Sequence, residues 1–144
     1  MMLHSILEGL HSRDEESRLI AATETGELVA TGQLSLEEHR LALEKLIEAV
    51  LHEPDSAVQE SILNSILIAG SSRRGGLDNV PWERLCLVLP TLEGVRLEYA
   101  LMAIGFSSRA EFASRIEPYL THPEDIVREA AIEALVELRQ PHAA

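Results

Sequence analysis

One short motif in this sequence has residue types and spacing that could hold a metal. Glu8-Gly9-Leu10-His11 is a Glu-x-x-His motif, and a di-iron helical bundle needs two such motifs with further carboxylates. The sequence has no second copy, and no two of its histidines form a His-x-x-x-His pair. We therefore predict no metal centre and no cofactor. We expect surface or turn positions for the histidines, which are His4, His11, His39, His52, His122 and His142.

Catalytic motifs are also incomplete. Gly70 and Gly75 have the glycine spacing of a phosphate-binding loop, but Gly76 and Leu77 occupy the positions that need Lys and Ser or Thr. Cys86 is the single cysteine, so no internal disulfide can form, and its apolar neighbours predict a small buried side chain. No Gly-x-Ser-x-Gly nucleophile motif is present. The sequence therefore predicts a protein that is not an enzyme.

Carboxylates dominate the charged residues. The chain has 24 Asp and Glu against 12 Lys and Arg, for a formal charge of −12. The charge is concentrated in residues 14–60 (net −9) and 124–139 (net −3), while residues 61–123 are neutral overall. Binding to nucleic acid requires clustered Lys and Arg, so this balance predicts no nucleic-acid partner and favours a basic protein.

The elements that would position these carboxylates are helices. Apolar residues make up 46% of the chain and aromatic residues only 3%, which suits close helix packing better than a β-sandwich. Capping boxes are expected at Ser12, Ser35 and Ser108, and Asp55 is expected to cap a helix over residues 56–69. We predict a single domain over residues 1–144. It contains a helical pair at 2–24, a loop at 26–34, a flexible loop at 70–80, and hairpins at 35–69, 81–105 and 108–139.

One segment of the chain is repeated. The stretch from Pro123 to Leu135 follows the same plan as the stretch from Pro54 to Ile66, which lies 69 residues earlier. Glu98 occupies the position of Glu60, 38 residues on. Such self-similarity is typical of stacked helical hairpins. Residues 1–34 have no clear copy of the pattern.

Residues 112–138 resemble a HEAT-type repeat. A first helix ends at Tyr119 to Pro123, Asp125 lies in the turn, and Val127-Arg128 begins the apolar pattern of a second helix. The resemblance implies an all-α fold, a short right-handed α-solenoid of about four HEAT-like hairpins. It also implies that second helices line the binding surface and that the function is protein binding.

Acidic residues recur at helical spacing on these predicted helices. Glu60, Glu98 and Glu129 share one repeat position, so stacked hairpins would align them in a ladder. The predicted partner-binding residues are Glu37, Glu44, Glu48, Glu60, Glu98, Asp125, Glu129 and Glu133. The alternative is an ordinary solvated helix face, on which Asp125 and Glu129 are favoured by the helix dipole.

Small, acidic helical-repeat proteins without catalytic residues are similar in type to bacterial immunity proteins, including those of contact-dependent growth inhibition systems. That resemblance implies a protein that neutralises a basic, nuclease-type toxin by occluding its active site. The alternative is a general HEAT-like adaptor or assembly scaffold that binds several proteins through an apolar groove. A third possibility, a small enzyme or an accessory to cofactor–protein bond cleavage, has no supporting motif.

The N-terminus lacks a basic region, and no apolar run approaches the ~18 residues of a membrane span. We therefore expect no membrane partner and a cytoplasmic location. The expected assembly is a monomer or a 1:1 heterocomplex.

Overall fold

The computed structural model describes residues 2–73 and 75–140. These residues form eight α-helices and four 3₁₀ helices, with no strand among them. The α-helices are α1 (Met2–Glu8), α2 (Glu15–Ala30), α3 (Leu36–His52), α4 (Ser56–Ser71), α5 (Trp82–Cys86), α6 (Gly94–Gly105), α7 (Ala113–Ile116) and α8 (Asp125–Leu138). The 3₁₀ helices are η1 (Gly9–His11), η2 (Leu89–Thr91), η3 (Ala110–Phe112) and η4 (Glu117–Thr121).

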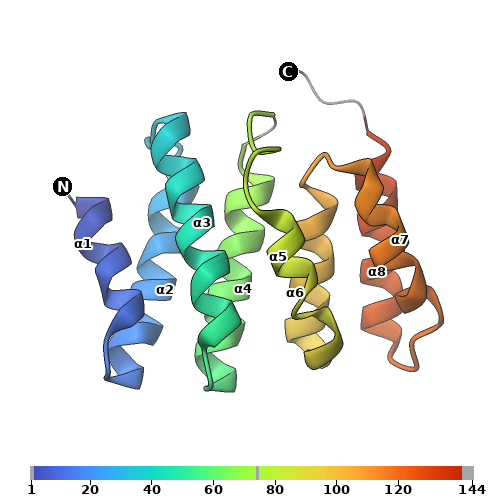
Figure 1. Ribbon diagram of the computed structural model, residues 1–144, viewed down its shortest axis with the longest axis horizontal. Coiled ribbons are helices and arrows are strands. Elements are labelled where there is room, and N and C mark those ends of the chain that lie inside the picture. Colours follow the sequence, from blue (N-terminus) through green and yellow to red (C-terminus); the bar gives the residue numbers. More distant parts are fainter. Residues whose placement is uncertain (1, 74, 141–144) are drawn as a thin grey trace.

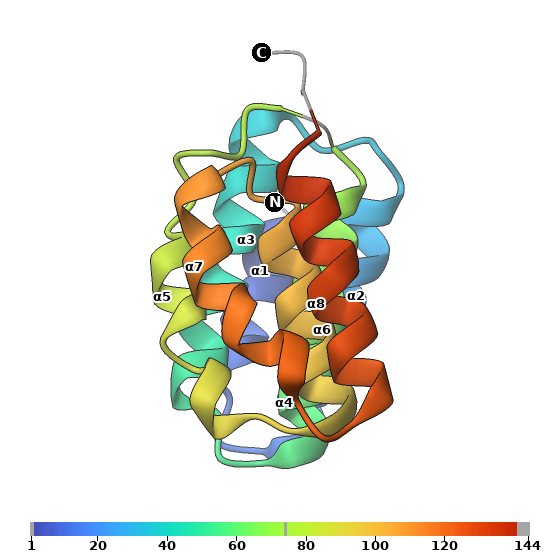
Figure 2. The same ribbon diagram turned by 90° about the vertical axis from the view of Figure 1, so that its right-hand side faces the viewer.

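Consecutive helices pair into hairpins that stack in two layers. Helices α1, α3, α5 and α7 form one layer, and α2, α4, α6 and α8 form the other (Figure 1). The end-on view in Figure 2 shows the two layers side by side, with α7 and α8 nearest the viewer. Each second helix packs on the second helix of the next hairpin, so this layer is continuous. The predicted all-α short solenoid of four hairpins is confirmed.

Two predicted helix starts are confirmed. Ser35 Oγ accepts from the Glu38 amide at 3.1 Å, and Glu38 Oε1 accepts from the Ser35 amide at 2.9 Å, which completes a capping box. Asp55 caps α4 by accepting from the Val58 amide at 3.0 Å. Together these caps fix the turn into and out of the second hairpin.

The capping box predicted at Ser12 is wrong. Asp14 is the N-cap of α2, and its carboxylate accepts from both the amide (3.1 Å) and the hydroxyl (2.8 Å) of Ser17. Ser12 instead accepts from the Asp14 amide at 3.1 Å. The predicted loop at 26–34 is also wrong at its start, because α2 continues through Gly26 to Ala30. Gly26 is buried against Ser65 of α4, so it serves close helix packing and does not end the helix.

The capping box predicted at Ser108 is wrong as well. Ser108 has a φ of 62°, outside the region from which its side chain could cap a helix. The first helix of the last hairpin is also broken into η3, α7 and η4. Pro118 contributes to the break because it has no amide to donate to a helical bond. The four-residue spacing of Phe112, Ile116 and Leu120 predicts that all three are buried on one helix face, but Leu120 is 37% exposed.

The third hairpin also has a shortened first helix. We predicted a helix from Pro81 to Pro90, but α5 ends at Cys86 and η2 follows. Cys86 is buried, as predicted. Trp82 begins α5 and is fully buried, and its Nε1 donates to the Leu77 carbonyl oxygen at 2.7 Å.

The predicted loop at 70–80 begins later than expected, because Gly70 and Ser71 belong to α4. Arg40 of α3 holds the far end of this segment, since its Nε donates to the Gly76 carbonyl oxygen at 2.8 Å. Arg73 and Arg74 in this glycine-rich segment could contact an acidic partner, and Arg74 lies outside the described residues. So do residue 1 and the end of the predicted domain at 141–144.

The first hairpin repeats the turn of the second and fourth hairpins, although the sequence of residues 1–34 has no clear copy of the pattern. Arg18 Nη1 donates to the carbonyl oxygens of Ser12 (3.0 Å) and Arg13 (3.2 Å) in the preceding turn. Gln59 Nε2 donates in the same way to the Glu53 carbonyl oxygen at 2.7 Å. Arg128 of α8 contacts the carbonyl oxygens of the turn before it at 2.7 and 3.1 Å. All three side chains lie four residues after a helix N-cap, so the repeat begins at α1.

Candidate functional site

The structure brings three of the predicted partner-binding carboxylates together. Glu98 of α6 lies within electrostatic range of Glu129 and Glu133 of α8. Helices α6 and α8 pack directly on each other, and all three residues lie on the solvent side of the second-helix layer. We call these three residues the acidic cluster. It comes from two adjacent hairpins, so it exists only when the hairpins stack.

The negative charges of the acidic cluster repel one another, and the pKa of Glu98 reflects this repulsion. Partial burial raises the pKa of the Glu98 carboxyl, and the nearby charges of Glu133 and Glu129 raise it further. Glu98 therefore favours protonation in the folded chain, and its charge opposes folding above its folded-state pKa. That cost is relieved as the pH falls through this pKa. A cationic group docked here would relieve the same cost at neutral pH.

The remaining predicted residues of the second-helix layer lie beside the cluster. Glu60 is exposed on α4 at the equivalent repeat position. Asp125 is exposed at the start of α8, where it forms an ion pair with Arg128. The pairing gives Asp125 a role within the turn of its own hairpin.

The last three predicted residues lie in the other layer. Glu37 and Glu44 are exposed on α3 and line a groove of about 400 Å³. Glu48 is half-buried on the same helix, beside a separate groove of about 230 Å³ near the turn into α4. The predicted carboxylates therefore form two groups on opposite layers (Figure 1).

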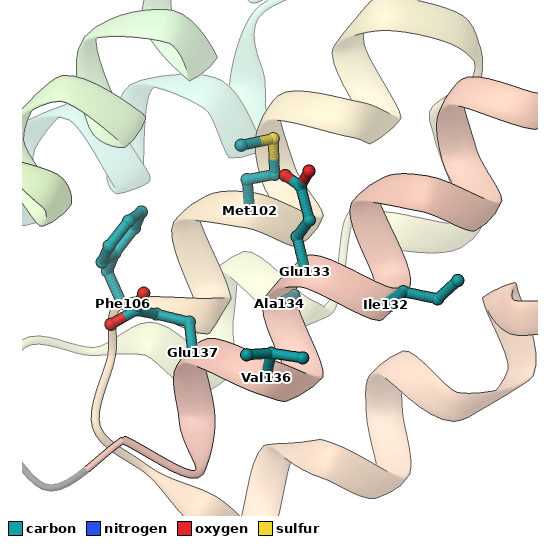
Figure 3. Close-up of a pocket in the computed structure, with 7 residues that line it drawn as sticks. All are labelled: Met102, Phe106, Ile132, Glu133, Ala134, Val136 and Glu137. Carbon is teal, nitrogen blue, oxygen red and sulfur yellow. The ribbon is translucent and has the colours of Figure 1, made fainter.

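An apolar groove that the sequence analysis did not identify adjoins the acidic cluster. It has a volume of about 310 Å³ and is lined mainly by Met102, Phe106, Ile132 and Val136. Glu133 lines its rim, so apolar and anionic surface meet there. Met102 and Phe106 lie on one side of α8, and Ile132 points to the other (Figure 3). The sequence signal was the apolar pair Ile132 and Val136, four residues apart among acidic residues.

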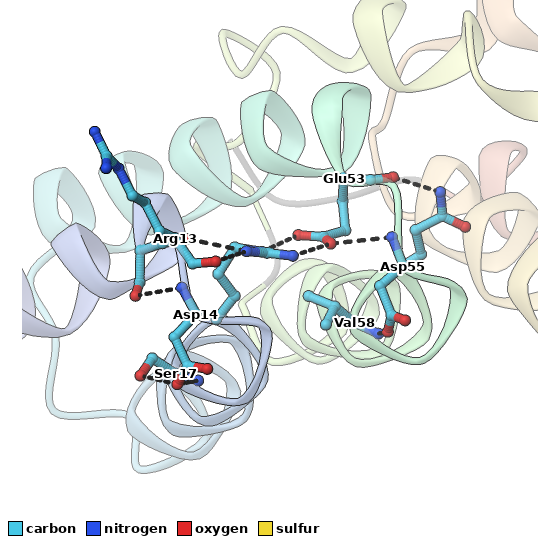
Figure 4. Close-up of polar contacts among 9 residues, drawn as sticks. Arg13, Asp14, Ser17, Glu53, Asp55 and Val58 are labelled. Carbon is cyan, nitrogen blue, oxygen red and sulfur yellow. Dashed lines mark hydrogen bonds and ion pairs between the residues drawn. The ribbon is translucent and has the colours of Figure 1, made fainter.

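A polar network that was also not predicted joins the first two hairpins at their turns. Arg18 donates to both carboxylate oxygens of Glu53, from Nε at 2.9 Å and Nη2 at 3.0 Å. Glu53 is 3% exposed and also accepts from the Asp55 amide at 3.1 Å (Figure 4). The network continues to the third hairpin, because Arg96 Nη1 donates to the Gln59 side-chain oxygen at 2.6 Å. Its role is to hold the stack together.

His39 corrects the prediction that the histidines lie at the surface or in turns. It is buried on α3, and its Nε2 donates to the Ala69 carbonyl oxygen at 2.6 Å. Burial lowers the pKa of the imidazole, and the charge of Arg73 lowers it further, against the opposing effect of the hydrogen bond. His39 is therefore a structural side chain that links α3 to the end of α4.

This shift gives a pH-dependent stability. The unfolded chain binds a proton at His39 more readily than the folded chain, so we expect the free energy of unfolding to fall as the pH drops below the ordinary His pKa of ~6.5. The loss ends at the lower folded-state pKa. His39→Gln, which can still donate to the Ala69 carbonyl, should remove this component of the pH dependence. Urea unfolding of both proteins from pH 7.5 to 5 measures it, and identical slopes would contradict the prediction.

Within 2–73 and 75–140, no group of three or more His, Cys, Asp or Glu side chains is arranged to hold a metal ion. No helix in this part of the chain is long and apolar enough to cross a bilayer. Burial raises the pKa of the Cys86 thiol, which disfavours the reactive thiolate.

The fold and surface define a helical-repeat protein, a short α-solenoid that presents acidic and apolar surface on its second helices. Its fold is similar to that of an engineered protein from the Northeast Structural Genomics Consortium, known from a crystal structure, with a TM-score of 0.76 and 17% sequence identity. The similarity covers 96% of this chain and 62% of the engineered protein, so the chain spans less than two thirds of that protein's length. No family model matches the sequence, and no curated protein matches it significantly.

Proposed function

We propose that this chain is a non-catalytic protein-binding scaffold whose acidic cluster docks a basic protein. The observation that carries the proposal is the convergence of Glu98, Glu133 and Glu129 from two helices that pack on each other. Partial burial of Glu98 and the two neighbouring carboxylates together raise the pKa of Glu98. Carboxylates held together in this way are stabilised by a cationic partner. Long-range attraction by the net charge of −12 would speed the encounter with such a partner.

Within this class we propose an immunity protein. The partner would be a basic, nuclease-type toxin, and the carboxylates would occupy the positive surface that otherwise binds phosphate. The small size, the acidic charge and the stacked hairpins support this proposal. It places the chain in a 1:1 complex in the cytoplasm.

The apolar groove favours a second candidate, a HEAT-like adaptor or assembly scaffold. Met102, Phe106, Ile132 and Val136 offer an apolar surface to which helices of several proteins could bind. Binding through this groove would depend little on salt, because apolar burial is not screened.

Charge reversal on one layer tests the main proposal against a matched control. Glu98→Lys, Glu129→Lys and Glu133→Lys together should abolish capture of a basic protein from native lysate. The wild-type chain should release that protein in a salt gradient. The control reverses Glu37, Glu44 and Glu48 on α3, so the total charge changes equally while the acidic cluster is preserved. We expect the control to retain the partner.

Three outcomes decide between the candidates. Loss of the partner in the cluster variant alone supports docking at the acidic cluster. Inhibition of the captured protein's nuclease activity by the wild-type chain would support the immunity role. Capture that survives high salt and the cluster variant would support the adaptor instead.

A further inference from the structure

The repeat register assigns a specific role to two exposed apolar residues of α8. The N-caps of the second helices are Asp14, Asp55, Glu93 and Glu124. The eighth residue after each N-cap is Ala22, Leu63, Leu101 and Ile132 in turn. The first three are 0% exposed, whereas Ile132 is 54% exposed.

This position faces the following hairpin in the stack. The Ala22 carbonyl oxygen accepts from Ser65 Oγ of the next second helix at 2.7 Å. One turn further along α6, Gly105 lies so close that an added Cβ would be 2.8 Å from the Ala134 Cα of the next second helix. Val136 occupies the position of Gly105 in α8 and is 50% exposed. Ile132 and Val136 therefore mark the face on which a further helix would stack.

The opposite end of the solenoid, at α2, has a carboxylate at the position where the other second helices contact the preceding hairpin. The tenth residue after each N-cap faces the preceding hairpin, and it is buried as Ser65, Ala103 and Ala134. In α2 the same position is Glu24, which is exposed. A carboxylate there resists stacking because burying it would cost its hydration. Polar outer faces of this kind are typical of capping repeats, which the N-terminal end resembles. Among the described residues, the exposed side chains of Ile132 and Val136 leave the α8 end open.

We propose that the open end of α8 binds an amphipathic helix of a basic partner protein, which stacks on Ile132 and Val136 as a fifth hairpin would. Glu129 and Asp125, which pairs with Arg128, are exposed one to three turns before these residues. The helix that fits has a small residue at the centre of its contact face, as α4, α6 and α8 have Ser65, Ala103 and Ala134. It carries Lys or Arg at the end that meets the two carboxylates.

Charge excludes a second copy of this chain as the occupant. Head-to-tail stacking would bury Glu24 of one copy against Ile132 and Val136 of the other. Pairing two α8 ends would join two segments that each have a net charge of −3 over residues 124–139, in chains of net charge −12. A basic helix meets neither obstacle. The inference adds a second surface to the proposed function and shares only Glu129 with the acidic cluster.

The test uses the full chain and a synthetic helical peptide with an Ala and Leu face edged by Lys. A peptide of the same length with Glu in place of Lys is the control. We expect the Lys peptide to bind and to shift the methyl NMR signals of Ile132 and Val136. Ile132→Gln with Val136→Gln should weaken binding about tenfold or more through loss of apolar contact. Ile20→Gln with Leu87→Gln, at exposed apolar positions on other surfaces, should leave it unchanged.

Each other outcome overturns the inference. Equal binding of the Glu peptide, no binding of the Lys peptide, or shifts confined to Met102 and Phe106 would each exclude an open stacking end for a basic helix. Self-association in sedimentation that Ile132→Gln abolishes would make a second copy the occupant. Glu98→Lys with Glu133→Lys leaves Ile132 and Val136 intact, so failure of the acidic-cluster proposal is measured separately.

Discussion

Glu53→Ala is expected to lower the free energy of unfolding by about 1–3 kcal/mol, because it removes the carboxylate that accepts from the Arg18 guanidinium and the Asp55 amide. Glu53 is 3% exposed and Arg18 is 16% exposed, so water replaces little of the lost interaction. The hydrogen bonds that Arg18 donates to the Glu53 carboxylate raise the pKa of Arg18, which stays charged in the folded chain. Urea unfolding followed by far-UV circular dichroism measures the loss.

Two further variants separate the ion pair from general effects of the substitution. Glu44→Ala on the exposed face of α3 should change stability by no more than about 0.5 kcal/mol. Arg18→Met combined with Glu53→Leu should recover much of the loss, because replacing both members of a buried pair leaves no unpaired charge. A Glu53→Ala protein within about 1 kcal/mol of wild type would contradict the prediction. The prediction would also be contradicted if the double variant lost as much stability as the sum of the losses in the single variants Arg18→Met and Glu53→Leu.

The sequence predicted the elements whose causes are local. Ser35 and Glu38 cap α3 because both groups lie within one turn, and the cap needs no help from distant residues. Ser12 has the same local pattern, but Asp14 is the N-cap of α2 because its carboxylate accepts two hydrogen bonds from Ser17. Two caps that compete within three residues are not separated by pattern alone.

The candidate site was predicted in part, since repeat register is visible in the sequence but stacking geometry is not. The shared position of Glu98 and Glu129 was read directly from the repeat, and the structure places them together with Glu133. The pairing of Arg18 with Glu53 joins residues 35 apart and depends on how the first two hairpins meet. The exposure of Ile132 could not be predicted from the sequence either, because Leu63 and Leu101 at the same repeat position are also apolar but buried.

The contact between α6 and α8 that builds the acidic cluster depends on Gly105. A Cβ at this position would lie 2.8 Å from the Ala134 Cα and 3.2 Å from the Ala134 carbonyl oxygen, so the backbone of α8 would have to move. Gly105→Ala should therefore cost about 1–3 kcal/mol of stability by overpacking, although Gly to Ala in a helix is normally favourable by about 1 kcal/mol. Urea unfolding measures the sign directly.

Gly70→Ala is the matched control for Gly105→Ala. Gly70 also lies in the last turn of a second helix, but a Cβ there would have its nearest contacts at 3.4 Å, an ordinary van der Waals distance. This variant should be as stable as wild type or up to about 1 kcal/mol more stable.

Gly105→Ala, which displaces α8, should also bring the pKa of Glu98 back toward its ordinary value, because Glu129 and Glu133 move away with the helix. A Gly105→Ala protein with wild-type stability and an unchanged Glu98 titration by NMR would show that the close packing of α6 on α8 does not build the cluster.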